Sequence, residues 1–478
     1  MKAMRNRSFA LLMIGLVALF APSALSRPQS RVGKVSYVPY QEARPIIDAM
    51  IEAAPAEIKA AGSSDAAWSA WVAKRDAEIR ARLVQGDEDS MINYMLFGTS
   101  FTRRERVTLK ALAEAREKAA SPEGARFVEL IKGRADDLIS GMAAPGSNER
   151  LLFSRAVVEA KGYDAKTAPA RERLKQYLLG NLARVLGEQA SYAKMLESAR
   201  MLGDPSGEFA ERSKLFRDRG LSSDTSLMPN FAIEKSLASM KSKGLLAAGS
   251  VRRVAIIGPG LDFTDKQDGY DFYPQQTIQP FAVIDSLLRL GLARPGDLRL
   301  TTLDLSARVN DHLKRARARA AQGASYVVQL PRDSRWQPDL ADYWSKFGDR
   351  IGEPAPPVAV PPALGDIKVR AVKIRPAVVS LISAEDLNVV LQRLELPAGE
   401  QFDLMIATNI LVYYDVFEQS LALANVEKML RPGGFLLSNN ALLELPVSRV
   451  RSVDYETVVY SDRANDGDHI VWYQRAAK

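Results

Sequence analysis

A change of residue pattern near Arg252 constrains the fold of this chain more than any other feature. From this point, short apolar runs alternate with segments in which apolar residues return every three or four positions. The first pattern predicts buried strands and the second predicts helices. Strands that alternate with helices build a parallel sheet with both faces covered. We therefore expect an α/β fold with a doubly wound sheet, with strands at residues 254–257, 298–303, 326–330, 378–382, 402–406 and 435–438 and helices at 280–290, 310–321, 339–347, 385–394 and 418–430.

The end of the chain departs from this alternation. Two β-prone runs, 455–460 and 469–474, flank Asn465-Asp466-Gly467-Asp468 with no helix between them. Turn-forming residues between two such runs predict a hairpin. The doubly wound sheet is thus expected to carry a C-terminal antiparallel hairpin.

The N-terminal half has a different texture. Residues 41–249 are rich in Ala, Glu, Lys, Arg and Leu, and their apolar residues form stripes at helical spacing, such as Trp68, Trp71, Val72, Ile79 and Leu83. Stripes of this kind are typical of helices that bury one face. We predict an all-α domain over residues 27–249 and the α/β domain over 250–478. The all-α domain is a candidate surface for a protein partner.

The first 26 residues resemble a targeting segment. Three basic residues precede an apolar run over residues 9–20, and the small residues Ala24 and Ser26 follow it. This arrangement predicts an export signal over residues 1–26, and hence a periplasmic or secreted protein. The alternative is an uncleaved anchor that holds the protein at a membrane. No later stretch is long and apolar enough to suggest a membrane span.

Composition removes several classes of function. The chain has no cysteine, which excludes disulfides, thiolate catalysis and cysteine-based zinc sites. Its only histidines are His312 and His469, so we expect no metal site and no histidine-based hydrolysis. Without residues 1–26 the net charge falls from +8 to +5, and no run of Lys or Arg resembles a nucleic-acid arm. We expect no nucleic-acid partner.

Residues suited to a nucleoside ligand follow three of the expected strands. Gly258 and Gly260 follow the first strand, Asp304 ends the second, and Glu385 and Asp386 follow the strand expected at 378–382. In a doubly wound sheet, ligands bind beyond the carboxyl ends of the strands, where the strand order reverses. Glycines allow the backbone to approach a ligand closely, and a carboxylate accepts hydrogen bonds from ribose hydroxyls. These positions predict a nucleoside site.

Two later stretches resemble a known superfamily. The segment Gln401-Phe-Asp-Leu-Met-Ile-Ala-Thr-Asn-Ile-Leu-Val-Tyr-Tyr-Asp415 resembles the fourth-strand motif of class I S-adenosylmethionine-dependent methyltransferases, and is most similar to the CheR-type protein carboxyl methyltransferases. Met429-Leu-Arg-Pro-Gly-Gly-Phe-Leu436 is similar to the turn before the fifth strand in the same superfamily. The resemblance covers about 225 residues and implies a Rossmann-like domain with S-adenosylmethionine as cofactor.

The resemblance also implies roles for individual residues. Gly258 and Gly260 would lie beneath the methionine part of the cofactor, and Asp304 would hold the ribose hydroxyls. Glu385 and Asp386 would lie near adenine.

The catalytic residues implied by the same resemblance are Asn409 and Tyr413. Asn409 would lie beside the sulfonium and would also contact the cofactor, and Tyr413 and Tyr414 would lie at or behind the site. Methyl transfer requires an in-line nucleophile held close to the sulfonium more than it requires an acid or a base. A chain with two histidines is compatible with that chemistry.

The chain departs from the family pattern at three places. Asp262 stands where many relatives have a third glycine, and Ala407-Thr408 replaces the usual Cys-Arg pair. An insertion over residues 263–279, rich in acidic and aromatic residues, lengthens the distance from Gly260 to the second strand. We interpret it as a loop over the cofactor mouth that selects the substrate, or as a surface insertion.

Three functions remain open from the sequence. The first is an S-adenosylmethionine-dependent methyltransferase whose acceptor is unknown, with a protein carboxylate or a small molecule as candidates. The second is an exported, non-catalytic module that binds a ligand or a protein, because this cofactor is made in the cytosol and the chain carries an export signal. The third is a nicotinamide-dependent oxidoreductase, which is disfavoured because Phe263 stands where the dinucleotide fingerprint requires glycine.

Overall fold

A computed structural model describes residues 33–60, 64–108, 111–112, 114, 121–202, 219–225, 227–263, 270–332, 335–365, 367–462 and 466–477. The predicted export signal over residues 1–26 lies outside the described residues. Within them, none of the helices combines the length and the apolar character that a membrane span requires.

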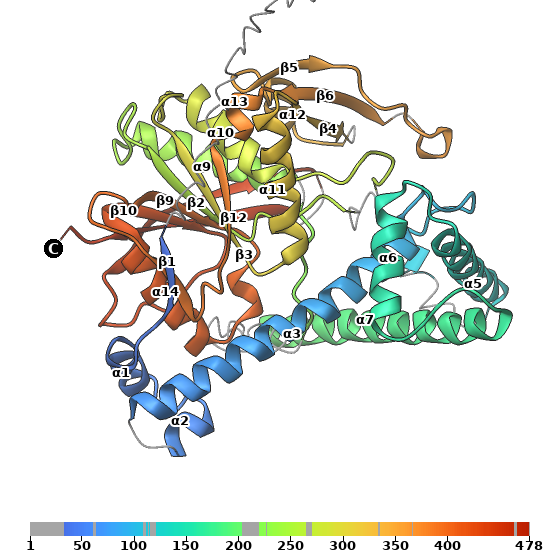
Figure 1. Cartoon of the computed structure of the whole chain (residues 1–478), viewed down its shortest axis with the longest axis horizontal. Helices are drawn as coiled ribbons and strands as arrows, with labels where there is room; N and C mark the ends of the chain where they lie inside the picture. The colour runs from blue at the N-terminus through green and yellow to red at the C-terminus, as the bar shows by residue number, and fades with distance from the viewer. Residues whose placement is uncertain are drawn as a thin grey trace, which may run out of the picture.

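A seven-stranded, mostly parallel sheet forms the centre of the molecule (Figure 1). Its order is β11-β12-β10-β9-β2-β3-β7, with β11 at Val450–Val459, β12 at Gly467–Arg475, β10 at Leu430–Ser438, β9 at Phe402–Ala407, β2 at Arg253–Ile257, β3 at Arg299–Asp304 and β7 at Ile382–Asp386. The five strands from β10 to β7 are parallel, and β12 is antiparallel to both of its neighbours. The fold is thus a mixed α/β, Rossmann-like sheet.

The strand order reverses beside β2. From β2 the chain moves outward to β3 and β7, and then returns to the other side of β2 to form β9 and β10. The carboxyl ends of β2 and β9 therefore border the point at which the winding changes direction. In open α/β sheets this is the place where ligands bind.

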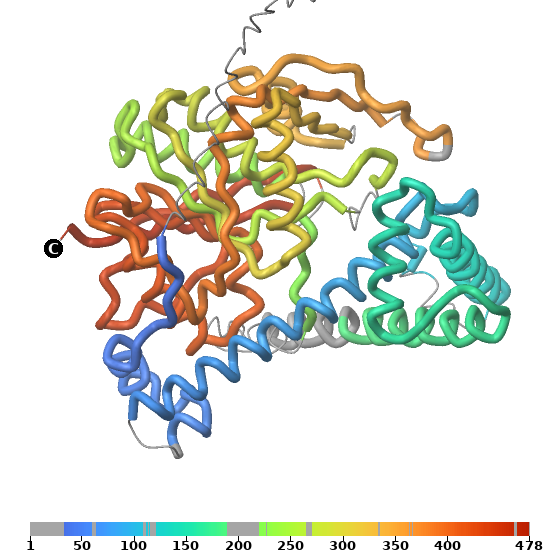
Figure 2. The backbone as a smooth tube through the Cα atoms, viewed as in Figure 1, coloured from blue at the N-terminus to red at the C-terminus, as the bar shows by residue number. Residues whose placement is uncertain are grey.

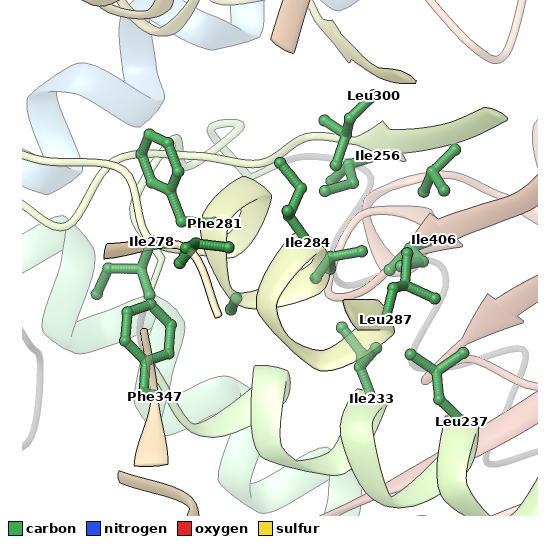
Figure 3. Packing of buried hydrophobic residues seen from close by; sticks show 14 of the residues in the cluster. Ile233, Leu237, Ile256, Ile278, Phe281, Ile284, Leu287, Leu300, Phe347 and Ile406 are labelled. Atoms are coloured by element: carbon green, nitrogen blue, oxygen red, sulfur yellow. The ribbon is translucent and has the colours of Figure 1, made fainter. Parts of the chain in front are cut away.

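Both faces of the sheet are covered because its central strands are apolar throughout. Alternate side chains point to opposite faces, so Ile256 and Leu300 join one buried cluster while Ala255 and Leu303 join another. The first face is covered by α9 (Met228–Ser242), α10 (Gln279–Arg289) and α11 (Ala307–Ala321). Figure 3 shows Ile256 and Ile406 of the sheet beside side chains of α9 and α10, including Ile233, Leu237, Ile284 and Leu287.

The opposite face is covered by helices from both ends of the chain. They are α14 (Val416–Met429), α1 (Tyr40–Ala49) and the first part of α3 (Asp65–Phe97), and their apolar side chains share one cluster with the strands. The short α2 (Ala56–Ala60) packs against α3. Trp71 of α3 meets Phe417 of α14 edge to face, with ring centroids 5.9 Å apart.

The second part of α3 leads to a separate group of helices. We call this group the helical lobe: the C-terminal part of α3 with α5 (Pro122–Ala143), α6 (Glu149–Ala160) and α7 (Ala168–Leu202). Figures 1 and 2 show α3 running from beneath the sheet to this lobe. The lobe has its own buried cluster, and the side chain of Phe263, from the loop after β2, is part of that cluster.

Packing crosses the predicted domain boundary between residues 249 and 250. Helix α9 precedes that boundary, yet Phe231, Ile233 and Leu237 belong to the same buried cluster as β2. The predicted all-α domain begins with a strand, β1 (Lys34–Tyr37), which pairs antiparallel with β8 (Gln392–Glu395). The division of the chain into domains stays a prediction.

The helix predicted at residues 385–394 is wrong. β7 continues through Asp386, and the chain then enters a buried segment that ends in β8. Leu387, Val389 and Val390 are all buried, so the segment has no polar face to expose as a helix would. The strand predicted at 378–382 is displaced for a related reason, because Pro376 begins the short helix α13 (Pro376–Val379) and β7 starts only at Ile382.

The run at 326–330 forms a strand, but outside the central sheet. β4 (Tyr326–Arg332) belongs to a small antiparallel sheet with β6 (Lys368–Ile374) and β5 (Gly352–Ala355). Helix α12 (Pro338–Lys346) and the single turn η1 (Pro362–Leu364) lie along the connections between these strands. β5 thus overlaps the start of a stretch rich in proline and alanine at residues 353–365.

Candidate functional site

A cavity of about 490 Å³ lies at the point where the strand order reverses, and we call it the switch-point cavity. It is bordered by the residues that follow β2, β3, β9 and β10, together with a segment from before α9. Its volume is in the range of pockets that hold a small molecule or a cofactor. The predicted site residues that border it are Gly258, Gly260, Asp304, Asn409 and Tyr413.

The loop after β2 requires glycine at two positions. Gly258 and Gly260 have φ angles of 63° and 64°, which other residues adopt only with strain. A Cβ on Gly258 would lie 2.1 Å from Cδ1 of Ile410, and one on Gly260 would lie 2.8 Å from the carbonyl oxygen of Ser223. The loop thus packs against Ile410 at Gly258 and against Ser223 at Gly260, with no space for a side chain at either position.

Asp304 places a buried carboxylate in the same cavity. It is the last residue of β3, is 9% exposed, and accepts a hydrogen bond from the backbone N–H of Ser306 at 2.7 Å. Burial raises the pKa of Asp304 to about 7, although hydrogen bonds from the backbone and the charge of Arg308 oppose the shift. A ligand that donates hydrogen bonds to this carboxylate would favour its ionised form.

Asn409 follows β9 in a strained backbone conformation. Its φ is 59°, the only positive φ of a non-glycine residue in the described part of the chain. Asparagine tolerates this region better than most residues, and such outliers gather at functional sites. The N–H of Asn409 donates to Oδ1 of Asn439 at 2.7 Å. In return, Nδ2 of Asn439 donates to Oδ1 of Asn409 at 2.6 Å, and it also donates to Oδ1 of Asp468 at 3.1 Å. These bonds join the ends of β9, β10 and the start of β12.

Two tyrosines follow Asn409 in the single turn η2 (Leu411–Tyr413) and at its end. Tyr413 is partly exposed and Tyr414 is buried, and both border the cavity. The carbonyl oxygen of Tyr413 accepts a hydrogen bond from Nη2 of Arg82 at 2.9 Å. Burial raises the pKa of Tyr414 well above its usual value, so its hydroxyl stays protonated. Helix α3 thus positions this part of the wall.

The structure does not bring Glu385 and Asp386 to the cavity. Both belong to β7 itself, and Asp386 pairs in register with Asp304. Its carboxylate forms an ion pair with Nη1 of Arg80 at 2.8 Å. The cavity is bordered on this side by Leu387 and Val389, which leave an apolar wall where the sequence predicted carboxylates. The two residues lie within β7 because that strand ends at Asp386 and not at residue 382 as expected.

A wall of the cavity comes from residues that the sequence did not single out. Ser223 and Thr225 lie beside the glycine loop, with the N–H of Leu261 donating to the Ser223 carbonyl at 2.7 Å and the N–H of Thr225 to the Leu261 carbonyl at 2.9 Å. Asp224 lies between them, and its Oδ2 accepts from Oγ of Ser90 in α3 at 2.8 Å. Short polar residues of this kind are typical of a break between helices and do not by themselves indicate a cavity wall.

The insertion after Gly260 attaches the helical lobe to the cavity loop. Arg150 of α6 is buried and donates to the carbonyl oxygens of Phe263, Tyr273 and Asp262. The carboxylate of Asp271 accepts hydrogen bonds from the backbone N–H groups of residues 99 and 100. The described residues of the insertion at 263 and 270–273 are mostly buried, so this part is not a surface loop; residues 264–269 lie outside the described residues.

The described lining of the cavity has a one-sided charge. Its only ionisable side chains are those of three aspartates and two tyrosines: Asp224, Asp304, Asp468, Tyr413 and Tyr414. None of the lining residues is Lys, Arg or His. Arg308 lies outside the lining but forms an ion pair with Asp224 at 3.7 Å. Asp304 and Asp468 therefore favour a ligand with hydroxyl groups and positive charge over a polyphosphate.

Comparison with known proteins gives likenesses at the level of solved structures. TrmN from Thermus thermophilus has 13% sequence identity and a TM-score of 0.24, and the match covers 52% of this chain and 52% of TrmN, about half the length of that protein. The glycopeptide N-methyltransferase MtfA, in complex with S-adenosyl-L-methionine, has 13% identity and a TM-score of 0.21 over 53% of this chain and 79% of MtfA.

The carbon methyltransferase CurJ has 13% identity and a TM-score of 0.24 over 92% of this chain and 100% of the CurJ chain. No protein-family model and no curated protein sequence matches the chain. At these identities and TM-scores, the likenesses assign neither a ligand nor a reaction to this chain.

Proposed function

We propose that the chain is an S-adenosylmethionine-dependent methyltransferase that binds its cofactor in the switch-point cavity. The observation that carries this proposal is the buried carboxylate of Asp304 in a cavity that also contains Gly258 and Gly260. This carboxylate already accepts a hydrogen bond from the N–H of Ser306, and its remaining lone pairs can accept hydrogen bonds from the hydroxyls of a ribose.

The residues of the cavity fit this cofactor. Gly258 and Gly260 would lie under its methionine part, Asp304 would hold the ribose, and Leu387 and Val389 offer an apolar wall for adenine. Asn409 would lie near the sulfonium. When bound, the cofactor supplies a methyl group on a positively charged sulfur, and a lining with carboxylates and no cations favours that charge.

The chain's own residues would orient the reaction rather than transfer protons. Asn409, Asn439 and Asp468 form a hydrogen-bonded chain at the end of the cavity where β9, β10 and β12 meet. These hydrogen bonds fix the side chain of Asn409, and a fixed wall helps to align a nucleophile in line with the methyl group. Tyr413 borders the same region.

The acceptor stays open between a protein carboxylate and a small molecule. The described lining offers no cation to hold a carboxylate, which favours a neutral or cationic acceptor. The resemblance of the segment around Asn409 to the CheR-type pattern supports a protein carboxylate as the acceptor.

Isothermal titration with S-adenosylmethionine and with S-adenosylhomocysteine tests the proposal. We expect both ligands to bind the unaltered protein, and Asp304→Ala to weaken both by about tenfold or more, since hydrogen bonds to a charged group contribute about 1.5–3 kcal/mol. Asp386→Ala is the matched control, because Asp386 is the register partner of Asp304 and lies outside the cavity. Absence of heat with both ligands would overturn the proposal, and equal losses in the two variants would overturn the site.

Export and a protein partner are separate proposals. We infer from residues 1–26 that the chain is exported, with a membrane-anchored form as the alternative, and from the separate core of the helical lobe that this lobe contacts a protein. A reporter fused behind residues 1–40 tests the first, and recovery of the reporter only in the cytosol would overturn it.

A further inference from the structure

Strand β7 is an edge of the central sheet. It follows β3 at the end of the strand order, and no strand in the described part of the chain pairs with its outer side. An uncovered edge of this kind presents backbone donors and acceptors to which another extended chain can pair.

The direction of the free backbone groups follows from the register with β3. The N–H of Leu300 donates to the carbonyl of Leu381 at 3.1 Å, and the N–H of Leu387 donates to the carbonyl of Asp304 at 3.3 Å. In a parallel ladder, alternate residues direct both backbone groups to the same neighbour. The backbone groups of Ile382, Ala384 and Asp386 therefore point away from β3.

A groove of about 1220 Å³ follows this edge, and we call it the β7 groove. Every residue from 380 to 386 borders it. A groove over one face of a strand would contact only every second residue, because successive side chains point to opposite faces. A groove that contacts every residue therefore follows the edge of the strand. Other lining residues come from α11 and α13, from a group with Arg80 and Gln392, and from the amino ends of β2, β3 and β9 at Arg253, Arg299 and Phe402.

The rim of the β7 groove carries more positive than negative side chains. Seven are cationic and three are acidic. Arg80 is paired with Asp386, and Arg253 with Glu400. Five others have no carboxylate within ion-pair distance among the described residues: Arg299, Lys314, Arg317, Arg350 and Arg375.

Arg317 is the most informative of the five. It lies on α11, which packs on β7, and is only partly exposed. Burial lowers its pKa, and the charge of Glu385 only partly opposes this shift. Lys314 lies one turn before it on the same helix and also borders the groove. A partly desolvated arginine beside a second cation gains free energy when an anionic group joins them.

We propose that the β7 groove binds an extended, acidic peptide segment as an additional strand beside β7. The outward groups of Ile382, Ala384 and Asp386 would hydrogen-bond the peptide backbone, and its acidic side chains would pair with Lys314, Arg317 and the other unpaired cations. This is recognition by strand addition, in which the backbone provides affinity and the side chains provide specificity.

The groove favours a peptide over a small anion for two reasons. Its volume exceeds the roughly 300–1,000 Å³ of most small-molecule pockets. It also follows the full length of β7, whose five residues span about 17 Å. A free phosphate or carboxylate would use the cations but would leave the backbone edge unpaired.

Fluorescence anisotropy with a labelled peptide tests this inference. The probe is a peptide of about nine residues that alternates Thr or Val with Glu, long enough to pair with all of β7. Its matched partner has the same sequence with N-methyl groups on alternate backbone amides, which keeps the charge and removes the hydrogen bonds. We expect the methylated peptide to bind at least about tenfold more weakly.

Variants of the full chain locate the peptide. Lys314→Glu with Arg317→Glu should weaken binding of the unmodified peptide by more than about tenfold. Arg315→Glu is the control, because Arg315 is exposed on the same helix and does not border the groove. Ala384→Pro removes one outward N–H without touching a bond to β3, and should also weaken binding.

Three results would overturn the inference. The first is equal affinity for the two peptides, and the second is an equal effect of the Arg315 variant and the Lys314/Arg317 variant. The third is complete displacement of the peptide by inorganic tripolyphosphate at the same concentration as the peptide, which would mark the groove as a general anion site. None of these measurements depends on cofactor binding or methyl transfer.

Discussion

The switch-point cavity and the β7 groove both reach the carboxyl end of β7, and their linings carry opposite charge. Asp304 and Asp386 are register partners on neighbouring strands, yet the first borders the switch-point cavity and the second borders the β7 groove. The cavity lining contains three carboxylates and no cation, whereas the groove contains seven cations. A step from one strand to its neighbour thus separates a cavity suited to a cation from a groove suited to an anion.

The difference arises from how each hollow is built. The cavity is closed by loops that are held in rare backbone conformations at Gly258, Gly260 and Asn409. The groove is an open edge with regular strand backbone along its floor. The cavity should therefore be sensitive to backbone changes, and the groove should be sensitive mainly to charge changes.

The largest effect is expected from Gly258→Ala. The new Cβ would combine a positive φ with a 2.1 Å approach to Ile410, so the loop must move. We expect binding of S-adenosylhomocysteine to fall more than about a hundredfold and stability to fall by about 2–4 kcal/mol, from backbone strain and overpacking together. Calorimetric titration and urea unfolding measure the two losses.

The double variant Gly258→Ala with Ile410→Ala separates the two causes. Removing the Ile410 side chain relieves the contact but not the backbone strain, so stability should return in part while binding stays weak. Peptide binding in the β7 groove should not change in either variant. A fall in peptide binding equal to the fall in cofactor binding would show that the two hollows are not independent.

Much of this cavity could be predicted from local sequence. A glycine pair after an apolar run, and an aspartate at the end of the next run, identify strand ends because strand and turn preferences act over a few residues. Asn409 was predicted from a longer motif. The structure places Gly258, Gly260, Asp304, Asn409 and Tyr413 around one cavity.

The parts that could not be predicted depend on contacts between distant segments. β8 pairs with β1, more than three hundred residues earlier, so the sequence around Val389 and Val390 contains no local sign of that partner. The wall formed by Ser223, Asp224 and Thr225 depends on a pairing with Leu261 that leaves no repeat or motif. Patterns within one segment predict its own structure and not its neighbour in space.

The next largest effect is expected from Arg150→Met. This buried side chain donates to three carbonyl oxygens of the loop that follows Gly260, and the substitution leaves those carbonyls without their donors. We expect a loss of about 3 kcal/mol in the free energy of unfolding, together with weaker cofactor binding. Arg155→Met is the control, because Arg155 lies on the same helix in an exposed pair and should change stability by less than about 1 kcal/mol.

A moderate effect is expected from pH. The pKa of Asp304 is raised to about 7, so its carboxylate is mostly protonated at pH 6 and mostly ionised at pH 8 in the free protein. Ribose hydroxyls would donate to the ionised form, so binding of S-adenosylhomocysteine should strengthen by about tenfold from pH 6 to pH 8. Asp304→Asn should bind weakly and without this pH dependence.

Stability should depend on pH in the opposite direction at the same residue. Because the folded state holds the Asp304 proton up to about pH 7 while the unfolded chain releases it near 3.8, this residue makes folding less favourable as pH rises between those values. The difference in unfolding free energy between the unaltered protein and Asp304→Asn, measured in urea at several pH values, isolates that contribution. A difference that does not change with pH would contradict the burial of this carboxylate.

The smallest effect is expected at Asn409, and it separates strain from chemistry. Asn409→Gly removes the cost of the positive φ and also removes the side-chain bond to Asn439, so the two changes oppose each other and the free energy of unfolding should change by less than about 1 kcal/mol. Asn409→Ala keeps the strain and loses the bond, and should be the less stable of the two. If Asn409 lies beside the sulfonium, Asn409→Gly should weaken binding of S-adenosylmethionine about threefold more than binding of S-adenosylhomocysteine, which lacks that charge. Equal changes for the two ligands would place Asn409 in the cavity wall without a role at the reacting group.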